Sequence, residues 1–106
     1  MLASSLPTPS VVVSADVSDL LGVERATQEV TDALGPIGVL VTCAAVRQDG
    51  LLMAQDAGAW TRTISLNLLG TYHACRAVLP GMIPPRAGRI VAVTSPVATT
   101  GNAGQT

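Results

Sequence analysis

The stretch Ile37-Gly38-Val39-Leu40-Val41-Thr42-Cys43-Ala44-Ala45 decides the fold class, because only Gly38 and Thr42 interrupt its apolar character. A run of this length is too short for a core helix, and it is typical of a strand that is buried on both faces. Strands of this kind belong to parallel sheets that helices cover on both sides. We therefore expect a central strand over residues 37–45.

Helical and strand patterns flank this central strand on both sides. Apolar residues recur at helical spacing over residues 20–34, and Gly35-Pro36 ends that pattern. A longer helix is predicted over residues 57–82, with an apolar stripe formed by Trp60, Ile64, Leu68, Cys75 and Leu79. The β-branched runs at residues 11–15 and 89–94 predict two further strands.

The predicted elements alternate as strand, helix, strand, helix, strand. Their connections are too long for hairpins, so the strands are expected to be parallel with right-handed crossovers. This order indicates the α/β class: a partial, Rossmann-type doubly wound parallel sheet with three strands and two main helices. Ligands of such sheets bind at the carboxyl ends of the strands, which are predicted here at Asp16, Ala44 and Ser95.

The composition excludes several classes of function. Hydrophobic residues make up 48% of the chain and charged residues 12%, which is apolar for a small free-standing domain. The net charge of −1 and the absence of a basic run argue against nucleic acid. The apolar runs are too short to span a membrane, and the start lacks a secretory pattern. Cys43 and Cys75 have no metal-ligand spacing, so we expect buried thiols in a reducing, cytoplasmic compartment and no metal site.

Five motifs occur in an order that resembles the short-chain dehydrogenase/reductase family over residues 11–106. They are Asp16-Val17, the segment 40–45 at the place of an Asn-Asn-Ala-Gly motif, Leu66-Asn67-Leu68-Leu69-Gly70, Gly88-Arg89-Ile90-Val91, and Thr94-Ser95 followed by Gly101-Asn102-Ala103-Gly104-Gln105. Residues 47–52 and 101–105 look most like 3-oxoacyl-acyl-carrier-protein reductases. The resemblance implies that residues 1–106 are the central part of one dinucleotide-binding domain.

The resemblance implies a cofactor, NADP or NAD, along the first two strand ends. Asp16 is expected to accept a hydrogen bond from the adenine amino group, with the backbone N–H of Val17 beside it. Compensation of the charge at a helix start is the alternative role for Asp16. Ala44 and Ala45 are expected under the cofactor ribose, with Ala45 at the motif's Gly position; a plain buried strand end is the alternative.

The resemblance also implies two catalytic residues. Ser95 is expected to donate a hydrogen bond to the substrate carbonyl, and the alternative is a simple cap of the strand end. Asn67 is expected to interrupt the long helix and hold a water molecule of the proton relay. Its alternative is a core Asn whose amide is satisfied by backbone.

The family's acid, a Tyr followed four residues later by Lys, is expected two positions beyond Thr106. The sequence contains no Lys, and its only Tyr, Tyr72, precedes Ser95. We therefore reject the Tyr72–Arg76 pair, which has the same spacing, and assign Tyr72 and His73 to an interface or the core. The glycine-rich phosphate loop is also absent from the sequence, so the 106-residue chain is expected to be inactive by itself.

Two functions remain open. The first is an oxidoreductase that reduces a small-molecule ketone, for instance a 3-oxoacyl thioester, to an alcohol. The second is a non-catalytic module, a truncated paralogue of the same family that folds by pairing with a full-length partner. The resemblance implies a homo-oligomer formed through the helix at residues 57–82.

Overall fold

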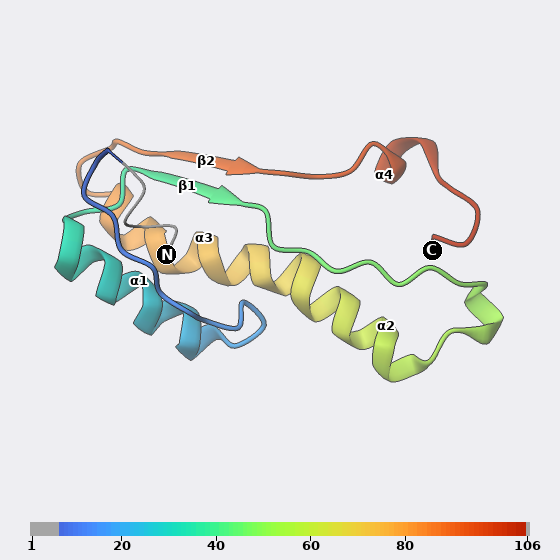
Figure 1. The fold of residues 1–106 in the computed structure, drawn as a ribbon. Helices are drawn as coiled ribbons and strands as arrows, with labels where there is room; N and C mark the ends of the chain where they lie inside the picture. Colours follow the sequence, from blue (N-terminus) through green and yellow to red (C-terminus); the bar gives the residue numbers. More distant parts are fainter. Residues whose placement is uncertain (1–6, 106) are drawn as a thin grey trace.

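The computed structural model describes residues 7–105. In chain order the elements are α1 (Leu20–Leu34), β1 (Val39–Thr42), η2 (Leu52–Ala54), α2 (Ala57–Ile64), η3 (Ser65–Leu69), α3 (Gly70–Met82), β2 (Arg89–Ala92) and α4 (Val97–Thr100). β1 and β2 are parallel, with Val39 opposite Arg89 and Thr42 opposite Ala92. Helices α1 and α3 lie on the same side of this strand pair (Figure 1). The α/β class is therefore confirmed as a partial doubly wound fold.

Both long helices form where the sequence predicts them, because local signals set their ends. Gly35, with a φ of 91°, follows α1 in a conformation that residues with a side chain rarely adopt. The Asp56 carboxylate accepts a hydrogen bond from the Ala59 N–H at 2.8 Å and so caps the second helix. That helix then runs through α2, η3 and α3 without a break, and η3 is a π-helical turn.

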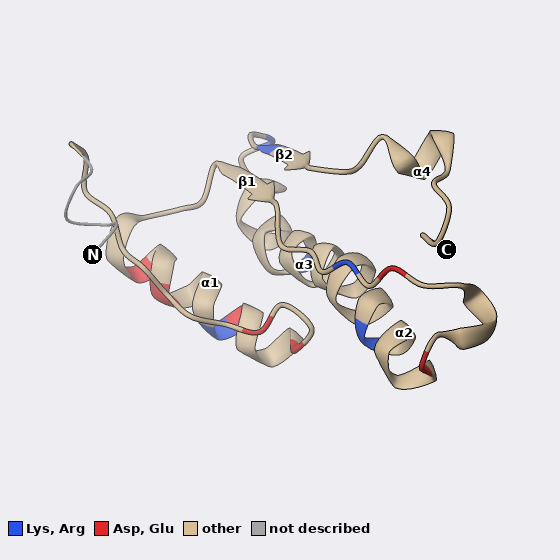
Figure 2. Ribbon diagram, turned by 45° about the vertical axis from the view of Figure 1, so that its right-hand side comes forward, with Lys and Arg blue, Asp and Glu red and all other residues tan. Residues whose placement is uncertain are grey.

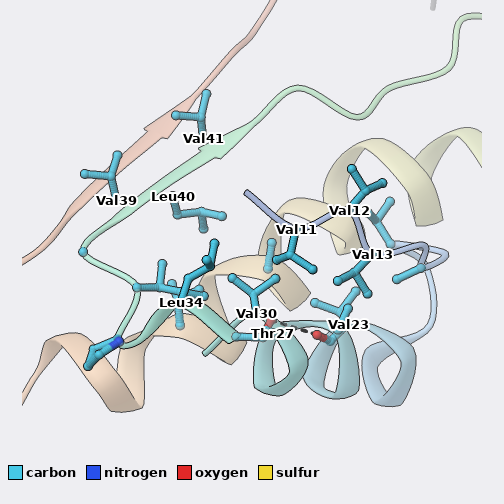
Figure 3. Close-up of a pocket in the computed structure, with 18 residues that line it drawn as sticks. Val11, Val12, Val13, Val23, Thr27, Val30, Leu34, Val39, Leu40 and Val41 are labelled. Atoms are coloured by element: carbon cyan, nitrogen blue, oxygen red, sulfur yellow. Dashed lines mark hydrogen bonds between the residues drawn. The ribbon is translucent and has the colours of Figure 1, made fainter. Parts of the chain in front are cut away.

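The strand predicted at residues 11–15 is not formed, so the described sheet has two strands and not three. A β-branched sequence favours an extended chain, but a strand also needs a hydrogen-bonded neighbour. Residues 11–13 lie across an apolar groove from β1 (Figure 3). The strands at 37–45 and 89–94 form over shorter ranges than predicted, as β1 and β2.

The second correction concerns burial. The side chains of Val39 and Val41 are 61% and 55% exposed, although the sequence predicts a strand covered on both faces. The described helices cover only one face. Cys43, predicted to be buried, is exposed. The accessible surface is 7867 Å², whereas a compact monomer of 10.8 kDa exposes about 5,500 Å².

The buried part of the fold centres on the face of α3 that meets α1 and the loop before it. Val23, Val78 and Met82 are the buried hydrophobic residues within 7–105. His73, also buried, places Nδ1 2.9 Å from the carbonyl oxygen of Val17. An added Cβ at Gly70 would lie 2.7 Å from Cγ2 of Val17, so only glycine allows this close approach.

Two glycines of α3 form a matched pair for testing this contact. Replacing Gly70 by Ala is expected to destabilise the chain, because overpacking costs about 1–3 kcal/mol and outweighs the helix-propensity gain of about 1 kcal/mol. Gly81→Ala is the control, since no atom lies within 4 Å of its added Cβ, and it is expected to be neutral or stabilising. Urea denaturation of both variants measures the difference. Equal stabilisation by the two substitutions would refute the close contact with Val17.

Candidate functional site

A pocket of about 530 Å³ lies between the segment that follows β1 and the segment that follows β2. Its lining includes Ala45, Asn67 and Ser95, which come from the β1 exit, from η3 and from the segment after β2. Because β1 and β2 are parallel, their carboxyl ends meet at the same edge of the sheet. The structure thus brings together three of the predicted site residues that lie far apart in the sequence.

Asn67 connects the long helix to the β1 exit through two hydrogen bonds. Its Oδ1 accepts from the backbone N–H of Val46 at 2.8 Å, and its Nδ2 donates to the carbonyl oxygen of Val46, also at 2.8 Å. Asn67 sits in the middle of the π-helical turn, and such turns are frequent at functional sites. The backbone partner matches the alternative role, and the π-helical turn changes the helix locally without interrupting it. One amide N–H of Asn67 remains for a further partner.

Ser95 is exposed, three residues beyond the end of β2. Its Oγ accepts a weak hydrogen bond from the N–H of Val97 at 3.4 Å, near the start of α4. This contact corresponds to the capping alternative. It leaves the hydroxyl proton free to be donated to a carbonyl oxygen in the pocket.

The last described residues close the far side of this pocket. Nε2 of Gln105 donates to Oδ1 of Asp49 at 3.0 Å, and the Gly50 N–H donates to the Gly104 carbonyl at 2.7 Å. Arg47 forms an ion pair with the same Asp49 oxygen at 3.3 Å. The sequence analysis did not predict the contact between Asp49 and Gln105. These two residues lie in the segments 47–52 and 101–105, which carry the resemblance to 3-oxoacyl-acyl-carrier-protein reductases.

Two of the four predicted cofactor residues, Val17 and Ala44, line a second, smaller hollow of about 260 Å³, next to Gly70 of α3. Ala45, the residue after Ala44 in the chain, lines the pocket of Ser95 instead.

Asp16 lines neither hollow and is exposed beside Val17. Its Oδ1 accepts from Oγ and from the N–H of Ser18, at 2.7 and 2.9 Å. These two hydrogen bonds lower the pKa of the Asp16 carboxyl below its ordinary value, the side-chain bond having the larger effect. The carboxylate is therefore ionised near neutral pH, and it is a pure acceptor for an amino group.

Tyr72 and Arg76, the pair rejected above, line neither hollow. Nη1 of Arg76 donates to the Tyr72 hydroxyl at 3.3 Å, and Nε of Arg76 is 3.9 Å from Glu24 of α1. The hydrogen bond to Tyr72 is the main reason why the Arg76 pKa is raised. Charged residues are concentrated on α1 and around α2, and β1 carries none (Figure 2).

Residues 7–105 contain no group of three His, Cys, Asp or Glu side chains that is arranged to hold a metal ion. Over the same residues, no helix has the length and apolar character needed to cross a bilayer.

Comparison with known proteins gives one consistent family. The family model described as short chain dehydrogenase matches residues 3–106. A 3-oxoacyl-acyl-carrier-protein reductase FabG from Vibrio harveyi is 40% identical over 94 residues, which are 89% of this chain and 38% of that protein. The same enzyme from Chlamydia pneumoniae is 41% identical over 91 residues, 86% of this chain and 37% of that protein.

An acetoacetyl-CoA reductase from a Synechocystis species is 33% identical over 99 residues, which are 93% of this chain and 41% of that protein. The chain therefore spans between 37% and 41% of the length of these three curated relatives.

The Asn67–Val46 contact predicts a local change in backbone protection. Asn67→Leu removes both hydrogen bonds, so amide exchange at Val46 is expected to accelerate by about tenfold, the equivalent of one hydrogen bond. The control is Asn102→Leu, because Asn102 lines the same pocket, while both hydrogen bonds of the Val46 backbone are made by Asn67. Exchange is followed residue by residue by NMR. Unchanged protection of Val46 in Asn67→Leu would contradict the contact.

Proposed function

Because the chain belongs to the short-chain dehydrogenase family, we propose that it carries part of the active site of an NAD(P)-dependent oxidoreductase. The reaction is the reduction of a ketone to an alcohol. The observation that carries this proposal is the pocket shared by Ala45, Asn67 and Ser95 at the carboxyl ends of two parallel strands. The names of the relatives, 3-oxoacyl-acyl-carrier-protein reductase and acetoacetyl-CoA reductase, favour a 3-oxoacyl thioester as substrate.

Ser95 acts on the substrate carbonyl. Its hydroxyl donates a hydrogen bond to the carbonyl oxygen, which stabilises the negative charge that develops there during reduction. Asn67 holds the β1 exit through Val46, and its free amide N–H is available for a relay water. Asn67 therefore has a positioning role for the pocket wall and a role in proton supply.

The residues present fit the adenine and ribose side of a dinucleotide. The ionised carboxylate of Asp16 suits an adenine amino group, with the Val17 N–H beside it. Ala44, which lines the smaller hollow, and Ala45, which lines the pocket of Ser95, lie under the ribose. When bound, NADPH or NADH supplies the hydride. The methyl group of Ala45, where the family motif has Gly, narrows the approach of the cofactor to the backbone.

The 106 residues contain no Lys and no Tyr other than Tyr72, so the family's proton-donating pair is not among them. We therefore propose that these residues alone do not turn over substrate. They bind the ketone and hold the carbonyl, whereas proton transfer needs groups outside residues 1–106. The sequence also contains no Gly-x-x-x-Gly-x-Gly pattern, which forms the loop that binds the cofactor phosphates. Binding of these phosphates therefore also needs groups outside residues 1–106.

Substrate binding is tested with acetoacetyl-CoA as the probe. Its affinity is measured from the amide shifts of residues that line the Ser95 pocket. Ser95→Ala is expected to weaken binding about fivefold, the equivalent of one neutral hydrogen bond. Ser14→Ala, an exposed serine outside the pocket, is the control and is expected to bind as well as the unmodified chain. Shifts confined to other surfaces, or equal affinities for both variants, would overturn the proposed role of Ser95.

A second function, in assembly, is favoured by the exposed side of the long helix. The side chains of its apolar stripe are largely exposed: Trp60, Ile64, Leu68 and Leu79 all are, and the exposed Tyr72 continues it. A stripe of this kind is typical of a helix that packs against another chain. We propose that a second copy of the long helix covers this stripe, which forms a homo-oligomer.

The oligomer proposal predicts a change in molecular mass. Leu68→Glu, at a side chain that is 63% exposed on the stripe, is expected to give a monomer by light scattering. Met53→Glu is the control, because Met53 is 93% exposed in η2, away from the stripe, and its substitution is expected to leave the oligomer intact. A monomeric unmodified chain, or dissociation by both substitutions, would refute assembly through this face.

A further inference from the structure

The segment from Ser95 to Gln105 receives little cover from the rest of the chain. Residues 89–103 are all exposed, and only Gly104 and Gln105 are half-buried. Before Ser95, the chain is held by the parallel pairing of β2 with β1. Beyond Ser95, the first covered residues are the two that return to the segment after β1 (Figure 1). Ser95 therefore lies between a strand anchor on one side and a loop anchor on the other.

The loop anchor consists of one backbone and one side-chain hydrogen bond. The Gly50 N–H donates to the Gly104 carbonyl at 2.7 Å, and Nε2 of Gln105 donates to Oδ1 of Asp49 at 3.0 Å. Within residues 7–105, these are the only hydrogen bonds between the segment after β1 and the segment after β2. The position of the chain beyond Ser95 therefore depends on these two contacts.

The loop that carries Asp49 is fixed by contacts of its own. Asn67 of η3 binds both backbone groups of Val46, and Nε2 of Gln55 donates to the Gly50 carbonyl at 3.2 Å. Neither Asn67 nor Gln55 belongs to the segment after β2. The Asp49 carboxylate is thus presented from a loop whose position is set by other parts of the chain.

Oδ1 of Asp49 has two partners, which differ in their expected weight. Nε of Arg47 is 3.3 Å away, and the Arg47 side chain is 77% exposed. An ion pair this exposed contributes little, because solvent screens it and a long side chain must be ordered. The bond to Gln105 joins two segments that lie far apart in the sequence, so its loss releases the chain beyond Ser95. The contact with Gln105 is therefore the one that bears on the pocket.

We propose that Asp49 is a positioning residue for Ser95. Its carboxylate holds Gln105, and with it the chain beyond Ser95, so that the Ser95 hydroxyl stays on the pocket it shares with Asn67. Asp49 acts on the ketone only through Ser95, because it reduces the conformational freedom that the Ser95 segment loses when substrate binds. The proposal rests on the proposed role of Ser95 in carbonyl binding.

The contact itself is tested without ligand, in the complete 106-residue chain. Asp49→Ala removes the acceptor, so the neighbouring bond from Gly50 to Gly104 opens more readily. Amide exchange at Gly50 is expected to accelerate by about tenfold, the equivalent of one hydrogen bond. Asp49→Asn keeps an oxygen acceptor for Gln105 and is expected to restore most of the protection.

Asp32→Ala is the matched control. Asp32 of α1 accepts a hydrogen bond from Nε2 of Gln28 at 2.7 Å, which is the same kind of pair outside the pocket. Its loss is expected to leave both the exchange rate of Gly50 and the binding of acetoacetyl-CoA unchanged.

The action through Ser95 is tested by a double-mutant cycle on the affinity for acetoacetyl-CoA. The Ser95 hydrogen bond is worth about fivefold in affinity, which sets the upper limit for a residue that acts only through it. Asp49→Ala is expected to weaken binding by about threefold, within that limit. In a Ser95→Ala background the same substitution is expected to have no effect, because no hydroxyl remains to be positioned. A merely structural role would weaken binding by the same factor in both backgrounds.

Three results would overturn the proposal, and they differ in what else they affect. Unchanged exchange at Gly50 in Asp49→Ala removes the contact on which the proposal depends. Unchanged affinity in Asp49→Ala, or equal weakening with and without the Ser95 hydroxyl, removes the positioning role and leaves the proposed function intact. If the unmodified chain binds no acetoacetyl-CoA, the proposed function fails together with the role of Asp49, whatever the exchange rate of Gly50.

Discussion

One face of the long helix fixes the positions of the two loops on which the candidate site depends. Asn67, Gly70 and His73 are spaced by three residues, so they lie along the same side of the helix. Asn67 binds both backbone groups of Val46, while Gly70 and His73 contact Val17. The loops after residues 11–15 and after β1 are thus held by the same element, and a shift of that helix moves both.

The segment that follows β2 is held differently from the segment that follows β1. Every residue from Arg89 to Ala103 is exposed, and Ser95 makes only a long hydrogen bond to Val97. The contacts that join this segment to the rest of the pocket are polar, from Gly104 to Gly50 and from Gln105 to Asp49. Segments with exposed hydrogen bonds and little apolar burial open at low free energy. The segment that carries Ser95 is therefore the part of the pocket wall that opens at the lower free energy.

The sequence predicts those features that local signals determine. Gly35-Pro36 and the 3.6-residue periodicity place α1 and the long helix, because caps and helical hydrogen bonds depend on near neighbours. Strand formation at residues 11–15 depends on a distant neighbour, so its sequence alone does not predict it. The bond between Asn67 and Val46 joins residues 21 positions apart, and no local pattern reveals it. Helix α4 is missed because Val97–Thr100 is too short to show periodicity.

The exposed apolar surfaces of the chain share side chains with the smaller hollow. Many of the exposed apolar residues lie on three surfaces: the groove, the uncovered sheet face and the stripe of the long helix. Others, including Leu21, Met53 and Ile83, lie outside these surfaces. Val17, Leu40 and Val41 line both the groove and the hollow beside Ala44. These three side chains couple the two surfaces, because any group that packs into the groove contacts side chains that also bound the hollow.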